Sequence, residues 1–359
     1  MGLFRTKPEP VDEIAALQAS LAKARNPKSV PNLRRRLLLG QLLLKNEDWA
    51  AGERHYTDLV SALTEEFGPR GPDTLAAWAN LAYCQTSQGR PAEAIPLLER
   101  TAEVFEETWG ARQPGTFRAQ LLLAEAYGVA AQYEDALAVL DAHVDYCTAE
   151  LGPAHARTRA GRRRKVTMLR ALARYETAEQ LLSNEEALCE TDEQRDALRG
   201  LLLVVQAETG DPEAAIAPMR DLFEKRPELG ESLATVLLLA GQAREAADLL
   251  RQSLGEARGR GALIIRTALA RACVESGNLD EAEHPARTVL AAGAWPAGHP
   301  MVLGLRATLA RAAAQRGDRA DAAAELESVV AGLKAVLGEA HPRVAQAAGW
   351  LAECWRPRA

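Results

Sequence analysis

A short phrase, a large apolar residue followed by glycine, recurs every 42 residues in the first half of the chain. It occurs as Phe67-Gly68, Trp109-Gly110 and Leu151-Gly152. Between these phrases lie two near-copies of one segment, with Leu81-Ala82 and Leu123-Ala124 at matching places. A fixed period of this size is typical of repeat proteins, in which each repeat buries its apolar face against its neighbours. The period therefore predicts a stacked array and not one globular core.

Composition indicates which element each repeat contains. The chain is rich in Ala, Leu, Glu and Arg, whereas aromatic residues make up only 5%. Those abundant residues favour helix, and the residues that favour strands are sparse. We expect an all-α fold, a right-handed α-solenoid of about eight antiparallel helix pairs with N- and C-terminal capping helices.

One small residue in the second helix of each pair marks the repeats. It falls at Gly52, Ala94, Ala136, Ala178, Ala215, Ala246, Ala282 and Ala322. A small side chain is expected where two helix backbones approach closely. Five residues upstream lies a turn glycine that can adopt positive φ and end the first helix. It is found at Gly89, Gly210, Gly241, Gly277 and Gly317.

These markers predict the domain boundaries. We expect a disordered tail at 1–10, a capping helix within 11–30, a solenoid over 31–337, and a C-terminal capping helix and tail over 338–359. The predicted repeats start near residues 31, 72, 114, 156, 195, 227, 262 and 300.

The pattern of Trp78, Leu81-Ala82, Gly89 and Ala94 resembles the tetratricopeptide repeat signature. The 42-residue spacing in the N-terminal half resembles the longer, kinesin-light-chain type of this repeat. The resemblance covers roughly nine tenths of the chain, although repeats four to six lack several signature residues. It implies a protein-interaction fold whose concave groove holds extended peptides.

Catalytic and metal-binding patterns are missing from the sequence. It contains no G-x-S-x-G, H-E-x-x-H, Walker A or G-x-G-x-x-G motif, and its six histidines are scattered. The five cysteines are far apart and form no C-x-x-C pair, which predicts free thiols in a reducing cytosol. We therefore expect no enzyme activity, no cofactor and no metal site.

The charge and hydropathy patterns constrain the partners. A net charge of −6 gives no overall attraction for nucleic acid or anionic membranes, and no apolar run is long enough to span a bilayer. The Ala- and Arg-rich composition is typical of a high-GC bacterium. We expect a cytoplasmic bacterial protein that does not bind membranes and that is monomeric.

The resemblance places one side of each first helix on the groove. The candidate partner-binding residues are Arg34, Gln41, Asn80, Tyr83, Arg118, Arg163, Arg164, Thr167 and Arg170. Asn80 falls where kinesin-light-chain-like repeats commonly carry an asparagine that hydrogen-bonds a ligand backbone. The alternative for Asn80 is an exposed polar residue without a binding role.

A basic stripe at 157–174 stands out from the acidic chain. It holds seven arginines and one lysine with no Asp or Glu. Arg suits bidentate capture of carboxylate or phosphate. Two alternatives compete with a ligand-binding role, because the stripe could be a solvated face or could pair with acidic second helices nearby.

Three functional hypotheses follow. The first is a non-catalytic scaffold or adaptor that binds a partner protein or peptide, with acidic residues in the partner, in the groove. The second is a nucleic-acid or phosphate-ligand binder that uses the stripe at 157–174, against which stand the acidic charge and the few aromatics. The third is a sensor of a small signalling peptide.

Overall fold

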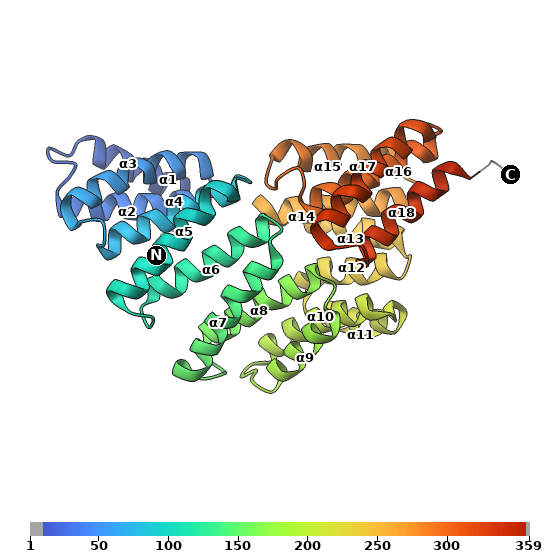
Figure 1. Ribbon diagram of the computed structural model, residues 1–359, viewed down its shortest axis with the longest axis horizontal. Helices are drawn as coiled ribbons and strands as arrows, with labels where there is room; N and C mark the ends of the chain where they lie inside the picture. The colour runs from blue at the N-terminus through green and yellow to red at the C-terminus, as the bar shows by residue number, and fades with distance from the viewer. Residues whose placement is uncertain (1–9, 357–359) are drawn as a thin grey trace, which may run out of the picture. The chain divides into compact units, whose positions relative to one another are not determined.

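The computed structural model describes residues 10–356, and these residues are almost entirely helical. The predicted tail therefore lies outside the described residues apart from Pro10, as do residues 357–359. Within the described range the chain forms eighteen α-helices and one short 3-10 helix, Pro227–Leu229, and contains no strand (Figure 1). The predicted all-α class is confirmed.

The chain divides into two compact units after Val129. The N-terminal unit contains α1 (Pro10–Ala22), α2 (Val30–Lys45), α3 (Trp49–Phe67), α4 (Pro72–Ser87), α5 (Pro91–Trp109) and α6 (Pro114–Val129). The C-terminal unit contains α7 (Tyr133–Leu151), α8 (Ala156–Ala171), α9 (Tyr175–Glu186), α10 (Asp192–Thr209), α11 (Pro212–Lys225), α12 (Gly230–Leu239), α13 (Ala243–Glu256), α14 (Gly259–Glu275), α15 (Leu279–Ala292), α16 (Pro300–Arg316), α17 (Arg319–Leu337) and α18 (Pro342–Trp355). In each unit every helix packs against the next along the chain, as expected for a solenoid of paired helices.

The 42-residue phrase is a repeated turn between helix pairs. Gly68, Gly110 and Gly152 have φ of 77°, 88° and 92°, a region that favours glycine. Six residues after each glycine a buried threonine hydroxyl donates a hydrogen bond of 2.9 Å to the glycine carbonyl. The three threonines are Thr74, Thr116 and Thr158. The sequence period thus reflects one turn geometry used three times.

The small residues of the second helices lie in the interior. The alanines at this position, from Ala94 to Ala322, are at most 3% exposed. In the first repeat the site is Gly52, where an added Cβ would lie 3.0 Å from the Cys84 Sγ atom on the neighbouring helix α4. Close helix contact therefore explains the need for a small side chain at this position.

The turns inside the pairs contain two kinds of residue. Gly89, Gly241 and Gly277 have positive φ, as predicted for a helix that ends in a left-handed residue. At the equivalent turns Ala131 and Ala173 have φ of 60° and 55°, a conformation that costs a non-glycine residue free energy. The stack imposes the turn even where the sequence lacks glycine.

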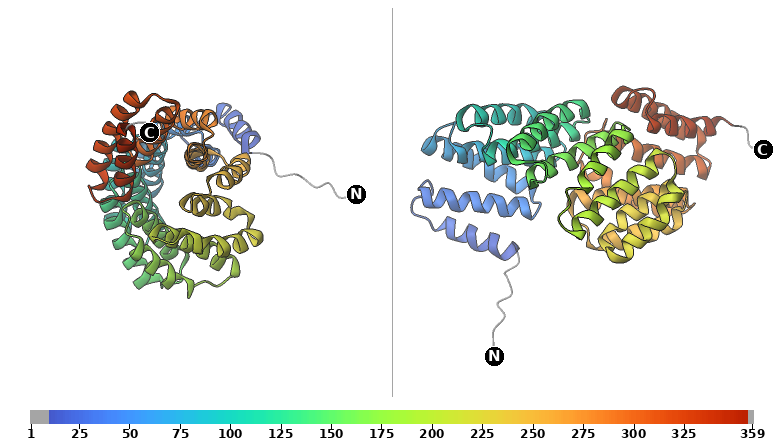
Figure 2. Two further views of the ribbon diagram at one scale, coloured as in Figure 1. Left: turned by 90° about the vertical axis from the view of Figure 1, so that its right-hand side faces the viewer. Right: turned by 90° about the horizontal axis from the view of Figure 1, so that it is seen from below.

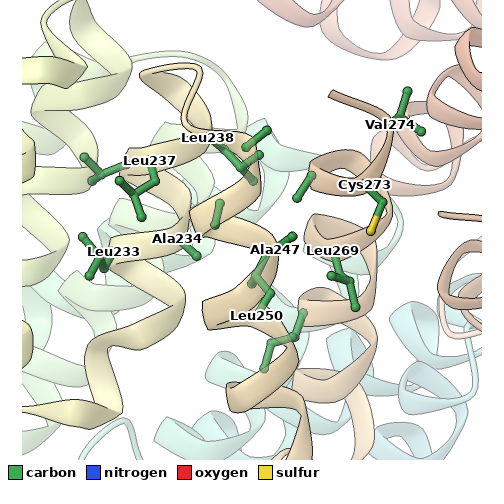
Figure 3. Close-up of a cluster of buried hydrophobic side chains, with 14 of the residues drawn as sticks. Leu233, Ala234, Leu237, Leu238, Ala247, Leu250, Leu269, Cys273 and Val274 are labelled. Atoms are coloured by element: carbon green, nitrogen blue, oxygen red, sulfur yellow. The ribbon is translucent and has the colours of Figure 1, made fainter. Parts of the chain in front are cut away.

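The apolar core of the C-terminal unit consists of successive clusters along the stack, one of which lies around α12. Around α12 it includes Leu233 and Leu237, which pack with Leu250 of α13 and Leu269 of α14 (Figure 3). Leu237 and Leu250 are fully buried. Burial of a leucine of this kind stabilises the fold by roughly 1.5–3 kcal/mol, so the interior of the stack supplies most of its stability.

The first helices of neighbouring pairs also contact one another directly. These contacts join α4 to α6, α10 to α12, and α14 to α16. Among the described residues of each unit, contacts of similar extent do not join consecutive second helices. Figure 2 shows the helices stacked side by side. In these pairs the first helices therefore approach each other more closely than the consecutive second helices do.

Candidate partner-binding surface

Asn80 lies inside the N-terminal unit and connects three helices. Its side chain is 3% exposed, and its Nδ2 atom donates to the Tyr56 hydroxyl of α3 at 3.0 Å. Its Oδ1 atom accepts a hydrogen bond of 2.6 Å from Arg118 of α6. Both the Nδ2 and the Oδ1 atom of the amide are therefore hydrogen-bonded within the protein. The alternative interpretation, in which Asn80 is an exposed polar residue, is wrong.

The Tyr56 ring explains part of this arrangement. A Cβ atom added to Gly40 of α2 would lie 2.5 Å from the ring, so glycine leaves room for it. Tyr56 is fully buried, and burial raises the pKa of its phenol. The sequence offered no signal for this link, because Tyr56 lies outside the positions that the repeat signature marks.

The remaining candidates of the N-terminal unit lie at its surface to different degrees. Arg34 and Gln41 of α2 are exposed, and Leu38 between them is 44% exposed. Tyr83 of α4 is half-buried, and its ring packs edge-on against Trp49 with centroids 5.4 Å apart. Arg34, Leu38 and Gln41 follow helical spacing, so they form one exposed stripe along α2.

Most of the basic stripe at 157–174 is used in ion pairs between helices. Arg162 of α8 pairs with Glu185 of α9 at 2.6 Å, and Lys165 pairs with Asp141 of α7 at 2.5 Å. Arg174 pairs with Glu134 of α7. These contacts support the alternative of pairing with acidic second helices for this part of the stripe.

Arg170 is also paired, although the sequence placed it among the groove residues. Its Nε and NH2 atoms each lie 2.8 Å from an oxygen of Glu208 on α10, which is a bidentate pair. The guanidinium is therefore occupied by another helix of the same unit. Arg170 connects consecutive first helices, a structural contact that its position in the stripe did not reveal.

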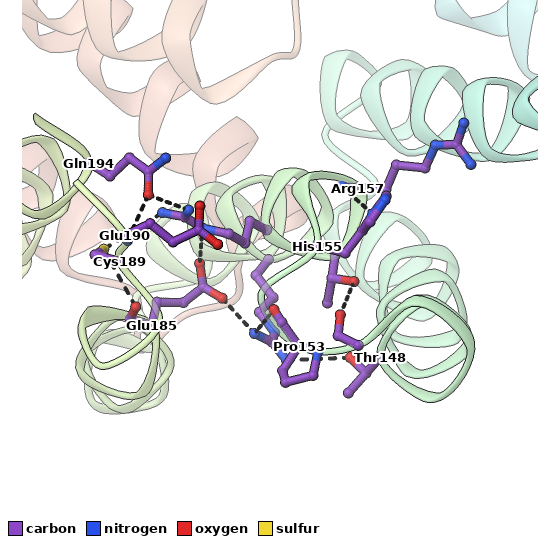
Figure 4. A network of polar contacts seen from close by, with 12 residues as sticks. Thr148, Pro153, His155, Arg157, Glu185, Cys189, Glu190 and Gln194 are labelled. Carbon is purple, nitrogen blue, oxygen red and sulfur yellow. Dashed lines mark hydrogen bonds and ion pairs between the residues drawn. The ribbon is translucent and has the colours of Figure 1, made fainter.

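Glu185 is the most buried member of this network. It is 2% exposed, and Arg159 and Arg162 both approach its carboxylate (Figure 4). Arg159 also donates to Gln194 at 2.6 Å and lies 3.6 Å from the Cys189 Sγ atom. A buried carboxylate is tolerated only when it is paired and hydrogen-bonded, so these arginines are required for packing.

Two cations of α8 remain available at its surface. Arg163 is exposed and Arg164 is half-exposed, and neither has a carboxylate partner among the described residues. Thr167 is exposed one turn further along, with its hydroxyl 3.3 Å from the Arg163 carbonyl. The structure therefore separates the stripe into paired residues and a small open group made of Arg163, Arg164 and Thr167.

Charge differs sharply between two of the first helices and two of the second helices. The first helices α2 and α8 carry four and seven basic residues and no acidic one. The second helix α7 carries five acidic residues and neither Lys nor Arg, and α9 carries four acidic residues and no basic one. Such a difference gives these helices opposite local potentials within a chain of net charge −6.

The described residues show no sign of reactive chemistry. Burial raises the pKa of the Cys84 thiol to about 12 and that of Cys273 to about 11, so neither thiol is activated. No group of three or more His, Cys, Asp or Glu residues in this part of the chain has the arrangement of a metal site. Within the same range, none of the helices combines the length and the hydropathy that a membrane span requires.

Comparisons with known proteins agree with this geometry. A family profile described as "Tetratricopeptide repeat" matches residues 33–107, and a second with the same description matches residues 302–343. No curated protein matches the sequence.

Three solved structures show different degrees of similarity. Kinesin-light-chain TPR-like repeats from Podosopora anserina are 23% identical, with 62% of this chain and 96% of that chain covered and a TM-score of 0.32. The Cut9 and Hcn1 hetero-tetramer of the APC/C is 12% identical, with 98% of this chain and 61% of that chain covered and a TM-score of 0.49. The apo quorum sensor NprR from B. thuringiensis is 16% identical, with 79% and 81% covered and a TM-score of 0.54.

The similarity to NprR supports the same fold and nothing further. The two profile matches lie near opposite ends of an array whose turns, small sites and helix pairs recur throughout the described residues. Residues 33–107 and 302–343 are therefore tetratricopeptide repeats, and the helix pairs between them continue the array.

Proposed function

We propose that this protein is a non-catalytic interaction scaffold that binds an acidic segment of a partner protein on its first helices. Tetratricopeptide repeats imply a protein-interaction scaffold, and the proposal adds the chemistry of the partner. The supporting observation is the open group on α8, where Arg163 and Arg164 lack a carboxylate partner among the described residues. Most of the other cations on the same helix form ion pairs with carboxylates of this chain.

Electrostatics favours an anionic partner at this position. Arg163 and Arg164 place two positive charges on one turn of α8, and a carboxylate from a partner would be attracted to both. Arg donates in a planar fork that fits a carboxylate, and charge-assisted hydrogen bonds contribute about 1.5–3 kcal/mol each. The exposed stripe on α2, with Arg34, Leu38 and Gln41, offers a second contact of mixed apolar and basic character.

Fluorescence anisotropy with a labelled peptide of alternating Glu and Leu tests the proposal. The double charge reversal Arg163→Glu with Arg164→Glu should weaken binding by about tenfold or more, and the affinity of the wild type should fall as salt rises. The matched control reverses Arg54 and Arg100, which are exposed on the second helices α3 and α5 and change the net charge equally.

Equal losses in both double variants would contradict the proposal, because they would reflect net charge alone. A wild type that ignores the acidic peptide but binds a single-stranded oligonucleotide in a salt-sensitive manner would also contradict it and favour the phosphate-binding alternative. Far-ultraviolet circular dichroism should show unchanged helicity in both variants, since the reversed side chains lie at the surface.

A further inference from the structure

Two histidines in the C-terminal unit each precede a helix, and each forms a hydrogen bond to a residue that is far away in the sequence. His299 precedes α16 and His341 precedes α18, 42 residues later. In each, the Nδ1 atom accepts a hydrogen bond of 3.1 Å from the backbone N–H two residues ahead, at Met301 and Arg343. Each histidine is therefore the N-cap of its helix through Nδ1, and its Nε2 atom contacts another part of the unit.

The Nε2 atoms reach residues far back in the chain. His341 Nε2 lies 3.1 Å from the carbonyl oxygen of Ala171, the last residue of α8. His299 Nε2 lies 3.4 Å from the hydroxyl of Tyr133, the first residue of α7. These contacts join residues 170 and 166 positions apart, whereas a repeat array ordinarily makes contacts between neighbours.

Both contacts are buried. His341 is 6% exposed and His299 is 8% exposed, and the Tyr133 and Trp295 rings pack around His299. The carbonyl of Ala171 ends a helix, so it lies beyond the hydrogen-bond pattern of α8 and needs an outside donor. His341 supplies that donor. Helices α16 and α18 thus fasten the C-terminal end of this unit to α7 and α8 at its start.

The hydrogen bonds of His341 define its protonation state. Its Nδ1 accepts from a backbone N–H, and its Nε2 can only donate to a carbonyl, so the ring is neutral with its proton on Nε2. A second proton on Nδ1 would face the Arg343 N–H and break the cap. The imidazolium would still donate from Nε2 to Ala171, but it would lose the cap and place a charge in a buried site, so the closed arrangement as a whole favours the neutral imidazole.

We infer that His341 and His299 form a closure contact that holds the C-terminal unit in a closed curve, and that protonation of His341 opens it. This regulation of shape goes beyond the proposed partner binding and does not depend on it. Opening would free the end of α8, the helix that carries Arg163 and Arg164, from the last repeats.

The groups around His341 agree with this direction. Burial is the main cause that lowers the pKa of His341, the hydrogen bond to Ala171 partly opposes it, and Arg343 of α18 adds to the lowering. Two titratable groups on the facing helices, Tyr175 of α9 and Tyr133 of α7, also interact electrostatically with Arg343. Burial raises the pKa of both tyrosines. None of these three neighbours is a carboxylate that would favour the imidazolium. The closed form is thus stable above the ordinary histidine pKa and lost as pH falls through the lowered one.

Hydrogen exchange of the full chain tests the inference with His341→Asn. Asparagine is a good N-cap but is too short to reach the Ala171 carbonyl, so the variant keeps α18 and removes the long contact. The matched control is His155→Asn. His155 caps α8 by the same Nδ1 contact, at 3.2 Å, but its side chain is exposed.

At about pH 7.5 the His341→Asn variant should exchange the amides of 168–175 and 341–346 about 2- to 10-fold faster than wild type, while His155→Asn should match wild type there. Lowering the pH to about 5.5 should accelerate the same segments of wild type, after correction for intrinsic rates, but should change His341→Asn no further. Unchanged exchange in His341→Asn at neutral pH would overturn the inference. An acid response of equal size in both proteins would also overturn it.

A second measurement decides the case if His341→Asn loses helicity. Nuclear magnetic resonance of the wild-type His341 ring should show the Nε2-protonated neutral form at neutral pH and a pKa below the ordinary histidine value. A ring that titrates at or above that value would contradict the closure, because burial and the Nδ1 cap would then not favour the neutral imidazole.

Discussion

The N-terminal and C-terminal units use one repeat in two ways. In the N-terminal unit the polar contacts between helices are local, such as the bond of 2.9 Å from the Trp109 Nε1 atom to the Arg70 carbonyl, 39 residues earlier. In the C-terminal unit the repeats become irregular, and His341 reaches back 170 residues to Ala171. Since an array bends by a small rotation at each repeat, altered repeat lengths change its curve. In the C-terminal unit, the irregular repeat lengths occur together with the inferred closure contact of His341. We therefore do not interpret them as a loss of the repeat.

Removing a buried ion pair should produce the largest difference in stability between the two units. Glu185→Ala in the C-terminal unit leaves Arg159 and Arg162 with a buried, unpaired charge, which should cost about 3–5 kcal/mol of unfolding free energy. Glu53→Ala in the N-terminal unit removes a more exposed pair with Arg90 and should cost about 0.2–1 kcal/mol. Urea denaturation of both variants measures the difference. Similar losses would show that the two networks are equally buried in solution.

Acidification should affect each unit through histidines whose pKa is lowered by burial, which include His55 in the N-terminal unit and His143 and His341 in the C-terminal unit. His55 lies 2.7 Å from the Arg36 carbonyl, and burial lowers its pKa, as it does for His341. Each group binds more protons when unfolded, so stability should fall as pH drops below about 6.5, by at most about 1.4 kcal/mol per pH unit for each group. His55→Gln should remove part of this slope from the N-terminal unit alone. Denaturant midpoints between about pH 7 and pH 5 check the sign, and a rise in stability on acidification would contradict it.

Substitutions at the turn residues should change the stability of the two units by the smallest amounts. Gly89 of the N-terminal unit has φ of 73°, so Gly89→Ala should destabilise by about 1 kcal/mol. Ala173 of the C-terminal unit has φ of 55°, and Ala173→Gly should relieve strain, with a gain of up to about 1 kcal/mol. Thermal melts of the two single variants should shift in opposite directions. A loss of stability in Ala173→Gly would mean that chain entropy outweighs the strain at this turn.

The sequence predicts the array because its signals are local. Gly68 and Thr74 act within one turn, and Ala94 packs against neighbouring helices, so a pattern of fixed spacing reveals them. The sequence predicts a C-terminal capping helix within 338–359, and α18 spans Pro342–Trp355. These features depend on the backbone of one or two repeats, and a periodic pattern records that dependence directly.

The candidate surface was harder to predict because spacing shows a face of a helix but not its partners. Arg163 and Arg170 lie on the same predicted stripe, yet Arg170 meets Glu208 and Arg163 does not meet a carboxylate in the described chain. Asn80 resembles a ligand contact in sequence, but the Tyr56 hydroxyl occupies it. The contact between His341 and Ala171 could not be predicted from the sequence, because no local pattern connects residues 170 positions apart.

The bond from His341 to Ala171 also sets an order of events during synthesis. A ribosome that adds about 5–20 residues per second completes α18 roughly 10–35 s after α8 has left it. Through that interval the helices up to α17 can assemble by neighbour contacts, while the end of α8 waits without its donor. The nascent C-terminal unit is therefore an open spiral first, and its final curve is fixed only when the last helix arrives.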